Sequence, residues 1–218
     1  MRHFPIRSTP AIPTSCAPRR ARSAGAGLPM AAVLAALLAG CASPLPPITW
    51  LRLPAEAPGA EVPPAAPVSH EVWQLMAPVG LPGHLDRDAL LVGSGGASLQ
   101  PLGGVRWAEP LRDVVPRLLR ADLTRAWGAP VWTAPLPPGV RPTRQLRVEF
   151  SALDVTADGR GVQLQARWSL ADALGAAPPQ VGEATFVTPA SGADADALAA
   201  AHRRALQQLA QRIVAAAR

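Results

Sequence analysis

The chain has 218 residues, of which 49% are hydrophobic, enough for one domain with a full core but not for two. Its formal charge of +6 is unevenly placed: five arginines and no acidic residue precede Cys41, and 16 arginines against 15 acidic residues follow it, a net charge of +1. The body of the chain is therefore nearly neutral. This argues against nucleic acid as a partner, which would require arginines clustered on one face.

The N-terminal segment has the layout of a secretory leader. A basic region that ends at Arg22 runs into the apolar stretch from Leu28 to Leu38, followed by small residues. At a rise of 1.5 Å per residue, this stretch covers about half of the ~30 Å hydrocarbon core of a bilayer. It is too short to span a membrane, so we expect it to be cut away.

The leader ends in "LAGC", which resembles the bacterial lipobox. Cleavage between Gly40 and Cys41 would leave Cys41 as an acylated first residue. The alternative, an ordinary buried or disulfide cysteine, has only Cys16 as a partner, and Cys16 lies in the leader. Several acyl chains hold a protein stably at a bilayer, so we predict a tethered protein. Ala42, in place of Asp, resembles the pattern for sorting to the outer membrane.

The chain after Cys41 divides into a spacer and a domain. Residues 43–67 are rich in Pro and Ala, which predicts an extended, stiff spacer, although "ITWLRL" (48–53) can form a first strand. We therefore expect a signal peptide over 1–40, a lipidated cysteine and tether over 41–69, and an α/β domain over 70–218.

The first half of the domain contains strands and one clear helix. Residues 70–82 predict a strand, and "ALLV" and "ASLQPL" around "GSGG" predict a hairpin. From Trp107 to Trp127, apolar residues recur at helical spacing, with Pro110 in the first turn and Gly128 as the stop. Pro116 lies inside this pattern, which predicts a bend.

The second half predicts a long hairpin, one more strand and a closing helix. "RQLRVEFSALDV" and "GVQLQARWSL" alternate with period two around the turn residues Asp158 and Gly159. A strand near "EATFVT" precedes the last helix, where Ser191 and Asp194 form a capping-box pattern. The elements together predict a single α/β domain with a mixed, largely antiparallel sheet and two principal helices.

Three stretches together resemble the ABC-type transport auxiliary lipoproteins, the PqiC-like family. They are "APVGLPGHLDRDALLV", "RWAEPLRDVVPRLLRADL" and "LRVEFSALDVTADGRGVQLQARWSL", and the resemblance covers about Ile48 to the C-terminus. Two features depart from the family pattern: His84 stands where an aromatic residue is usual, and "TWLRL" replaces a Tyr-rich first strand.

The resemblance implies a fold similar to the N-terminal domain of TolB and a lipoprotein on the periplasmic face of the outer membrane. It also implies work with an MCE-domain protein and an inner-membrane component in lipid traffic between membranes, without ATPase activity. An oligomer of several copies around a partner is compatible with this role. No Walker-type loop is present, because "GSGG" and "LGG" lack the following Lys-Ser/Thr.

Candidate site residues gather at "HLDRD" and at the start of the predicted helix. His84, Asp86 and Asp88 could form a metal or acid/base site, but alternating polar residues after Pro82-Gly83 are typical of a solvated turn, in which Arg87 neutralises a carboxylate. We favour the turn, with a buried contact from Asp86 to the backbone or to an arginine, and predict no metal, no cofactor and no catalytic residue.

The residues that we assign to partner binding are Leu81, His84, Asp86, Arg87 and Trp107. Trp107 and Glu109 also fit an anchor and a favourable charge at a helix start, and we prefer that role for Trp107. His202, beside Arg203 and Arg204, is expected to be partly exposed and structurally neutral.

Three functions follow, in order of preference. The first is a non-enzymatic lipoprotein that docks an MCE partner in lipid transport. The second is an assembly lipoprotein that supports an outer-membrane β-barrel. The third is a tethered periplasmic hydrolase, for which no nucleophile is paired with a base in the sequence.

Overall fold

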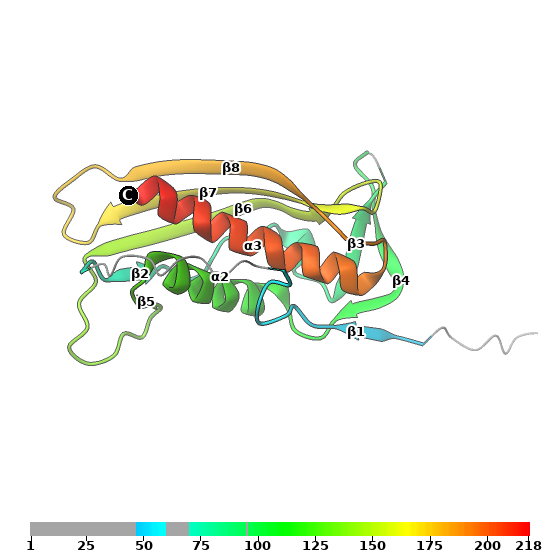
Figure 1. The fold of residues 1–218 in the computed structure, drawn as a ribbon, viewed down its shortest axis with the longest axis horizontal. Coiled ribbons are helices and arrows are strands. Elements are labelled where there is room, and N and C mark those ends of the chain that lie inside the picture. Colours follow the sequence, from blue (N-terminus) through cyan, green and yellow to red (C-terminus); the bar gives the residue numbers. More distant parts are fainter. Residues whose placement is uncertain (1–46, 60–69, 95) are drawn as a thin grey trace, which may run out of the picture. The chain divides into compact units, whose positions relative to one another are not determined.

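The computed structural model describes residues 47–59, 70–94 and 96–218. In this part of the chain, an eight-stranded mixed sheet carries two helices on one face (Figure 1). The strands are β1 (Thr49–Leu51), β2 (Trp73–Leu75), β3 (Ala89–Gly93), β4 (Leu99–Trp107), β5 (Val131–Trp132), β6 (Arg144–Val155), β7 (Gly161–Asp172) and β8 (Gln180–Pro189); the helices are α2 (Leu111–Trp127), α3 (Ala195–Ala217) and the short 3-10 helix η2 (Gly83–Leu85). The predicted single α/β domain is confirmed.

Strand β6 organises the sheet because it has neighbours along both edges. On one edge it pairs antiparallel with β7, which pairs antiparallel with β8. On its other edge β2 runs parallel to its first residues and β3 meets its last, through Val92 and Val155. β5 lies beyond β2, and β4 and β1 lie beyond β3. The long pairings are antiparallel and most of the short ones are parallel, so the sheet is mixed as predicted.

A β-bulge keeps the apolar residues of β6 on the inner face. Phe150 pairs with Ala166 and Ala152 with Gln165, so one extra residue, Ser151, sits in β6. Before the bulge Leu146, Val148 and Phe150 point inward. After it Leu153 and Val155 do so, and all five are at most 3% exposed. The shift in phase follows the sequence, in which the alternation changes step at the same place.

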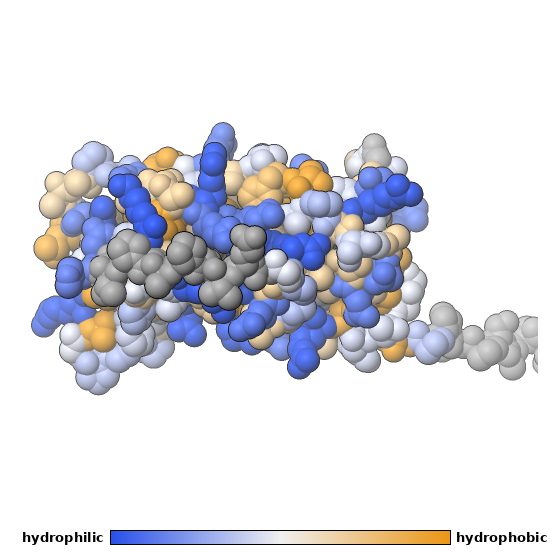
Figure 2. All heavy atoms as spheres, in the orientation of Figure 1, coloured by the Kyte–Doolittle hydropathy of each residue, from blue (hydrophilic) through white to orange (hydrophobic). Residues whose placement is uncertain are grey.

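Helices α2 and α3 lie next to each other over the inner face of the sheet (Figure 1). The two helices and the inner side chains of the strands form one hydrophobic cluster. Trp73 of β2 stacks on Trp127 at the end of α2, with ring centroids 4.2 Å apart. The solvent side of the helices is a mixture of hydrophilic and hydrophobic residues (Figure 2). The helices thus cover one side of the sheet, and no helix of the described residues covers its other side.

The described part of the spacer predicted for 43–67, residues 47–59, packs against the domain, while 43–46 and 60–67 lie outside the described residues. β1 pairs parallel with β4, and Leu51, Leu53 and Ala57 are at most 6% exposed. The first strand expected at 48–53 is therefore present, and it brings the following turn into the core.

The starts of both long helices differ from the predictions. Trp107 ends β4 and does not begin a helix, since α2 starts at Leu111 with Pro110 as its N-cap. α2 contains Pro116, as the sequence pattern implied, and ends as expected at Gly128 with φ of 78°. The N-cap of α3 is Asp194, whose carboxylate accepts from Ala197 N–H at 2.8 Å, so Ser191 and Asp194 do not form a capping box.

Candidate functional site

Backbone hydrogen bonds hold one end of the turn between β2 and β3, and a buried leucine holds the other end. Gly80 donates its N–H to Val148 O at 3.1 Å and accepts from Phe150 N–H at 2.8 Å, so the chain joins β6 for one residue. A Cβ at Gly80 would lie 3.0 Å from Cγ of Glu149, which explains a glycine at this close approach. Leu85, 7% exposed, anchors the far end in the core.

The charged side chains of this turn reach three different elements. His84 Nε2 lies 2.6 Å from Asp154 Oδ1 of β6. Asp86 pairs with Arg112 of α2, and Asp88 Oδ1 accepts from Arg106 Nη1 of β4 at 2.9 Å. Because His84, Asp86 and Asp88 each have a separate partner, the turn is tied to β6, α2 and β4 together.

This arrangement disperses the groups that a metal or acid/base site would need. In residues 47–59, 70–94 and 96–218, no three His, Cys, Asp or Glu side chains lie close enough to hold a metal ion. Asp86 contacts an arginine, as predicted, but the pair is half exposed and not buried. The partners of Asp86 and Asp88 are Arg112 and Arg106. Arg87 was expected to neutralise one of these carboxylates; it is exposed and makes no ion pair within the described chain.

The predicted partner-binding residues fall into an exposed group and a buried group. Asp86 and Arg87 are exposed, His84 is half-buried, and Leu81 packs partly against the core. Trp107 is 4% exposed, and its ring meets that of His202 edge-on with centroids 5.3 Å apart. Trp107 therefore offers no surface to a partner in this structure and serves as an anchor before α2. Gly40 and Cys41 lie outside the described residues.

His202 is buried, which corrects the expectation that it is partly exposed. It is 1% exposed on α3, and its Nδ1 lies 2.8 Å from Leu198 O. Burial lowers the pKa of His202, and the contact with Leu198 O and the charge of Asp154 oppose this only in part. The signal was in the sequence: His202 lies four residues after Leu198 and therefore on the apolar stripe of the helix.

A buried ion pair between α2 and α3 has no counterpart in the sequence-based predictions. Arg203 Nη1 lies 2.5 Å from Asp122 Oδ2, and Arg203 Nη2 lies 2.7 Å from Asp122 Oδ1. The same guanidinium donates to the carbonyls of Pro54 and Ala55, at 3.0 and 2.9 Å. It thereby ties the segment after β1 to both helices.

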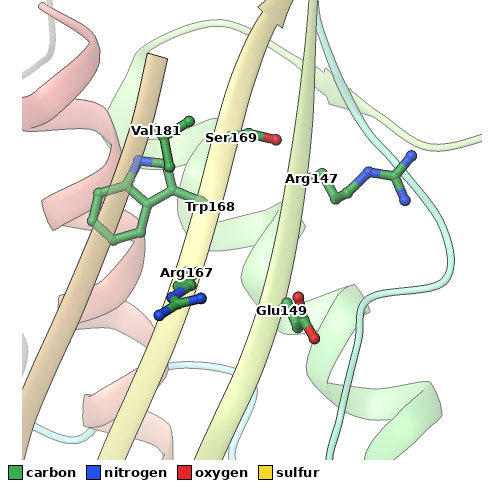
Figure 3. A pocket seen from close by; sticks show the side chains of 6 residues that line it. All are labelled: Arg147, Glu149, Arg167, Trp168, Ser169 and Val181. Carbon is green, nitrogen blue, oxygen red and sulfur yellow. The ribbon is translucent and has the colours of Figure 1, made fainter. Parts of the chain in front are cut away.

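The open face of the sheet carries a shallow hollow of about 130 Å³ (Figure 3). Arg147 and Glu149 of β6, Arg167 and Ser169 of β7, and Val181 of β8 surround it, and the ring of Trp168 lies against Gly182 from the inner side. The charges are exposed and of both signs, and Arg167 forms a loose ion pair with Glu183 at 3.7 Å. Among the described residues that line the hollow none is a histidine, and no hydrogen bond joins Ser169 to Glu149.

A second, larger groove of about 520 Å³ follows β8 where this strand meets α3. Its walls are Glu183, Ala184, Thr185 and Phe186 of β8 and Gln208 and Arg212 of α3. Within the described chain β8 pairs only with β7, so its outer backbone edge is free. An unpaired strand edge can extend a sheet by pairing with another strand.

The fold is shared with proteins of known structure. One is an uncharacterized protein, 16% identical, with a TM-score of 0.62, covering 79% of this chain and 100% of the other. A second is protein XCC0632 from Xanthomonas campestris, of the family model DUF330, 19% identical, with a TM-score of 0.59, covering 78% of this chain and 93% of the other. Comparison with curated proteins finds no match. None of the described helices is long and apolar enough to cross a bilayer.

A family model covers nearly the whole described domain. The model for the ABC-type transport auxiliary lipoprotein component matches residues 52–214, from the residue after β1 to the last turn of α3. The description names two properties, a lipoprotein and an auxiliary role in ABC-type transport, and both agree with the resemblance found in the sequence. With most of its length matched, the chain belongs to the family of ABC-type transport auxiliary lipoprotein components.

Proposed function

We propose that this protein is a non-enzymatic component of an MCE-type intermembrane lipid transport system, held at the periplasmic face of the outer membrane by acyl chains on Cys41. The observation that carries the proposal is the family match over residues 52–214 in a chain whose leader ends in "LAGC". The acylated cysteine supplies the anchor and the folded domain supplies the contact with an MCE-domain protein, which connects to an inner-membrane component.

The turn between β2 and β3 is the part of the domain that we assign to this contact. Leu81, His84, Asp86 and Arg87 lie within seven residues. The hydrogen bond of His84 with Asp154 and the ion pair of Asp86 with Arg112 hold the turn against the sheet and α2. A rigid, charged loop loses little conformational freedom on binding. Arg87 has no ion-pair partner in the described chain, so its guanidinium is available to a carboxylate of the MCE-domain protein.

Two measurements on cells test the proposal. Cys41→Ala removes the acylation site, so the domain should move from the membrane fraction to the soluble periplasmic fraction. A photo-crosslinking residue in place of Arg87 should capture an MCE-domain subunit, while the same residue in place of Leu174, in the β7–β8 connection, should not. Retention of Cys41→Ala in the membrane fraction would reject the anchor, and capture of a β-barrel protein or of no transport subunit would reject the docking role.

A further inference from the structure

The first strand exposes its large side chains on one face only. Leu51 and Leu53 are each 4% exposed, whereas Ile48 is 53% exposed and Trp50 is 60% exposed. Since side chains alternate along an extended chain, Ile48, Trp50 and Arg52 share the outer face. Of the remaining described tryptophans, four are at most 6% exposed and Trp132 is half-buried. Trp50 is thus the tryptophan that the fold leaves in solvent.

These three residues, which we call the β1 patch, lie on the edge strand β1 (Trp50) or directly beside it (Ile48 and Arg52), at one end of the domain. Within the described chain β1 pairs only with β4 (Figure 1). In this pairing Trp50 lies opposite Arg106. Arg52 is exposed and no described carboxylate lies within ion-pair distance of it. The β1 patch therefore combines an aliphatic side chain, an indole with its N–H, and an unpaired guanidinium.

The length of chain between the patch and Cys41 restricts what can cover it. Ile48 is seven residues from Cys41, and seven residues span at most about 25 Å when fully extended. A surface that holds the acyl chains of Cys41 is therefore always within about 25 Å of the patch, whatever path the chain takes. The segment between Cys41 and Ile48 therefore keeps the lipid leaflet that holds the acyl chains close to Ile48, Trp50 and Arg52.

The chemistry of the patch fits that surface. Tryptophan is enriched at the level of the headgroups, where its ring meets acyl carbon and its N–H meets water or ester oxygens. Arginine binds phosphate through its planar fork, and a branched aliphatic side chain adds apolar burial.

We propose that the β1 patch rests on the headgroups of the leaflet that holds the acyl chains of Cys41. The contact fixes one end of the domain at the membrane and turns the opposite end away from it. This inference rests on the anchor given under the proposed function and adds a second, noncovalent contact to it.

A single fluorescent probe tests the contact in the acylated protein. Cys16 leaves with the leader and Cys41 is acylated, so Trp50→Cys provides the one reactive thiol of the mature chain. The variant is labelled with the dye NBD and reconstituted in vesicles of phosphatidylethanolamine and phosphatidylglycerol. Emission should shift to the blue and rise about two-fold relative to detergent-free buffer, because the dye leaves water, and lipid-borne spin labels should quench it.

Matched controls separate the possible results. Leu174→Cys, 94% exposed in the β7–β8 connection at the far end of the domain, should show no change with vesicles, and Ile48→Cys should repeat the result at position 50. Water-like emission at positions 48 and 50 in protein that floats with the vesicles overturns the contact and leaves the anchor standing. A blue shift at position 50 without vesicles also overturns it and assigns the patch to a second copy. Protein that does not float rejects the anchor itself, and the contact with it.

Discussion

Asp122 of α2 and Arg203 of α3 form a two-pronged ion pair from which solvent is excluded, with side chains 1% and 0% exposed. The guanidinium of Arg203 also binds the carbonyls of Pro54 and Ala55. One side chain therefore joins two helices to the segment that follows β1. A charge so deeply buried is tolerated only with a complete set of partners, which is what the structure provides.

Removal of one member of this pair should destabilise the domain strongly. Arg203→Met leaves the Asp122 carboxylate buried with only Arg125 near it, and breaking a buried pair in this way costs about 3–5 kcal/mol. Urea unfolding followed by circular dichroism measures the loss. Arg167→Met serves as control, because the exposed pair of Arg167 with Glu183 is worth at most about 1 kcal/mol. A loss for Arg203→Met no larger than that of the control contradicts the structural role.

The double variant Asp122→Leu/Arg203→Met should recover part of the loss. Replacement of both charges by apolar groups removes the unpaired carboxylate, and such replacements are often neutral. The carbonyls of Pro54 and Ala55 still lose a donor, which costs about 1–3 kcal/mol for a buried group. The double variant should therefore unfold between the wild type and Arg203→Met in the same urea titration.

Burial of His202 predicts a loss of stability in mild acid. The pKa of His202 is lowered by burial in the folded state, whereas the unfolded chain binds the proton at about pH 6.5. The unfolded state therefore gains protons first as the pH falls. The free energy of unfolding is undiminished above about pH 6.5 and falls below it, by at most about 1.4 kcal/mol per pH unit for one histidine.

Urea midpoints between pH 5 and pH 8 measure this slope. His202→Gln replaces a buried ring, so it should be less stable than the wild type at pH 8. Because glutamine next to Leu198 O cannot titrate, the variant should lose less stability than the wild type on acidification. His70→Gln, at an exposed position, serves as the control for the exchange of histidine for glutamine. Equal slopes for His202→Gln and wild type would show that other groups carry the acid sensitivity.

A methyl group at Gly182 should disturb the sheet edge. A Cβ there would lie 2.4 Å from Cζ2 of Trp168, and a buried indole ring cannot move aside without repacking. Overpacking of this kind typically costs about 1–3 kcal/mol. Gly182→Ala should therefore lower the urea midpoint and change the near-ultraviolet circular dichroism of tryptophan. Gly103→Ala, where a Cβ meets nothing within 4 Å, should change neither.

The ion pair between Asp86 and Arg112 should matter for docking more than for stability. Both side chains are half exposed, so the pair contributes at most about 1 kcal/mol to folding. Asp86→Arg and Arg112→Asp should each reduce the photo-crosslink from position 87 to the MCE-domain subunit, because the turn loses its tie to α2. The exchanged double variant should restore it. A crosslink yield unaffected by either single change would place the docking surface elsewhere.

The alternating strands and the apolar helices were predictable because each depends on a local period. The hairpin β6–β7, the stop at Gly128 and the closing helix follow from spacing and turn residues within a few positions. The bulge at Ser151 is visible in the sequence only as a change of step between Phe150 and Leu153. It becomes interpretable once the partner strand is known.

The candidate site was harder to predict because its contacts cross the chain. His84 meets Asp154 from 70 residues away, and Arg203 meets Asp122 across 81 residues. The helical spacing of apolar residues places His202 on the apolar face of its helix, but it does not predict that the ring of Trp107 packs against His202. The turn at 83–88 was correctly predicted as a turn, while the partners of its carboxylates, Arg106 and Arg112, required the fold.

The contacts of Arg203 with Pro54 and Ala55 also affect how the domain would respond to tension applied from its N-terminal end. Tension applied at Pro47 reaches β1 first, a three-residue strand held at its edge by β4. Pro54 and Ala55, whose carbonyls accept hydrogen bonds from Arg203, follow β1 along the chain. A pull from this end would therefore load the pairing of β1 with β4 before it loads the contacts of Arg203 with Pro54 and Ala55.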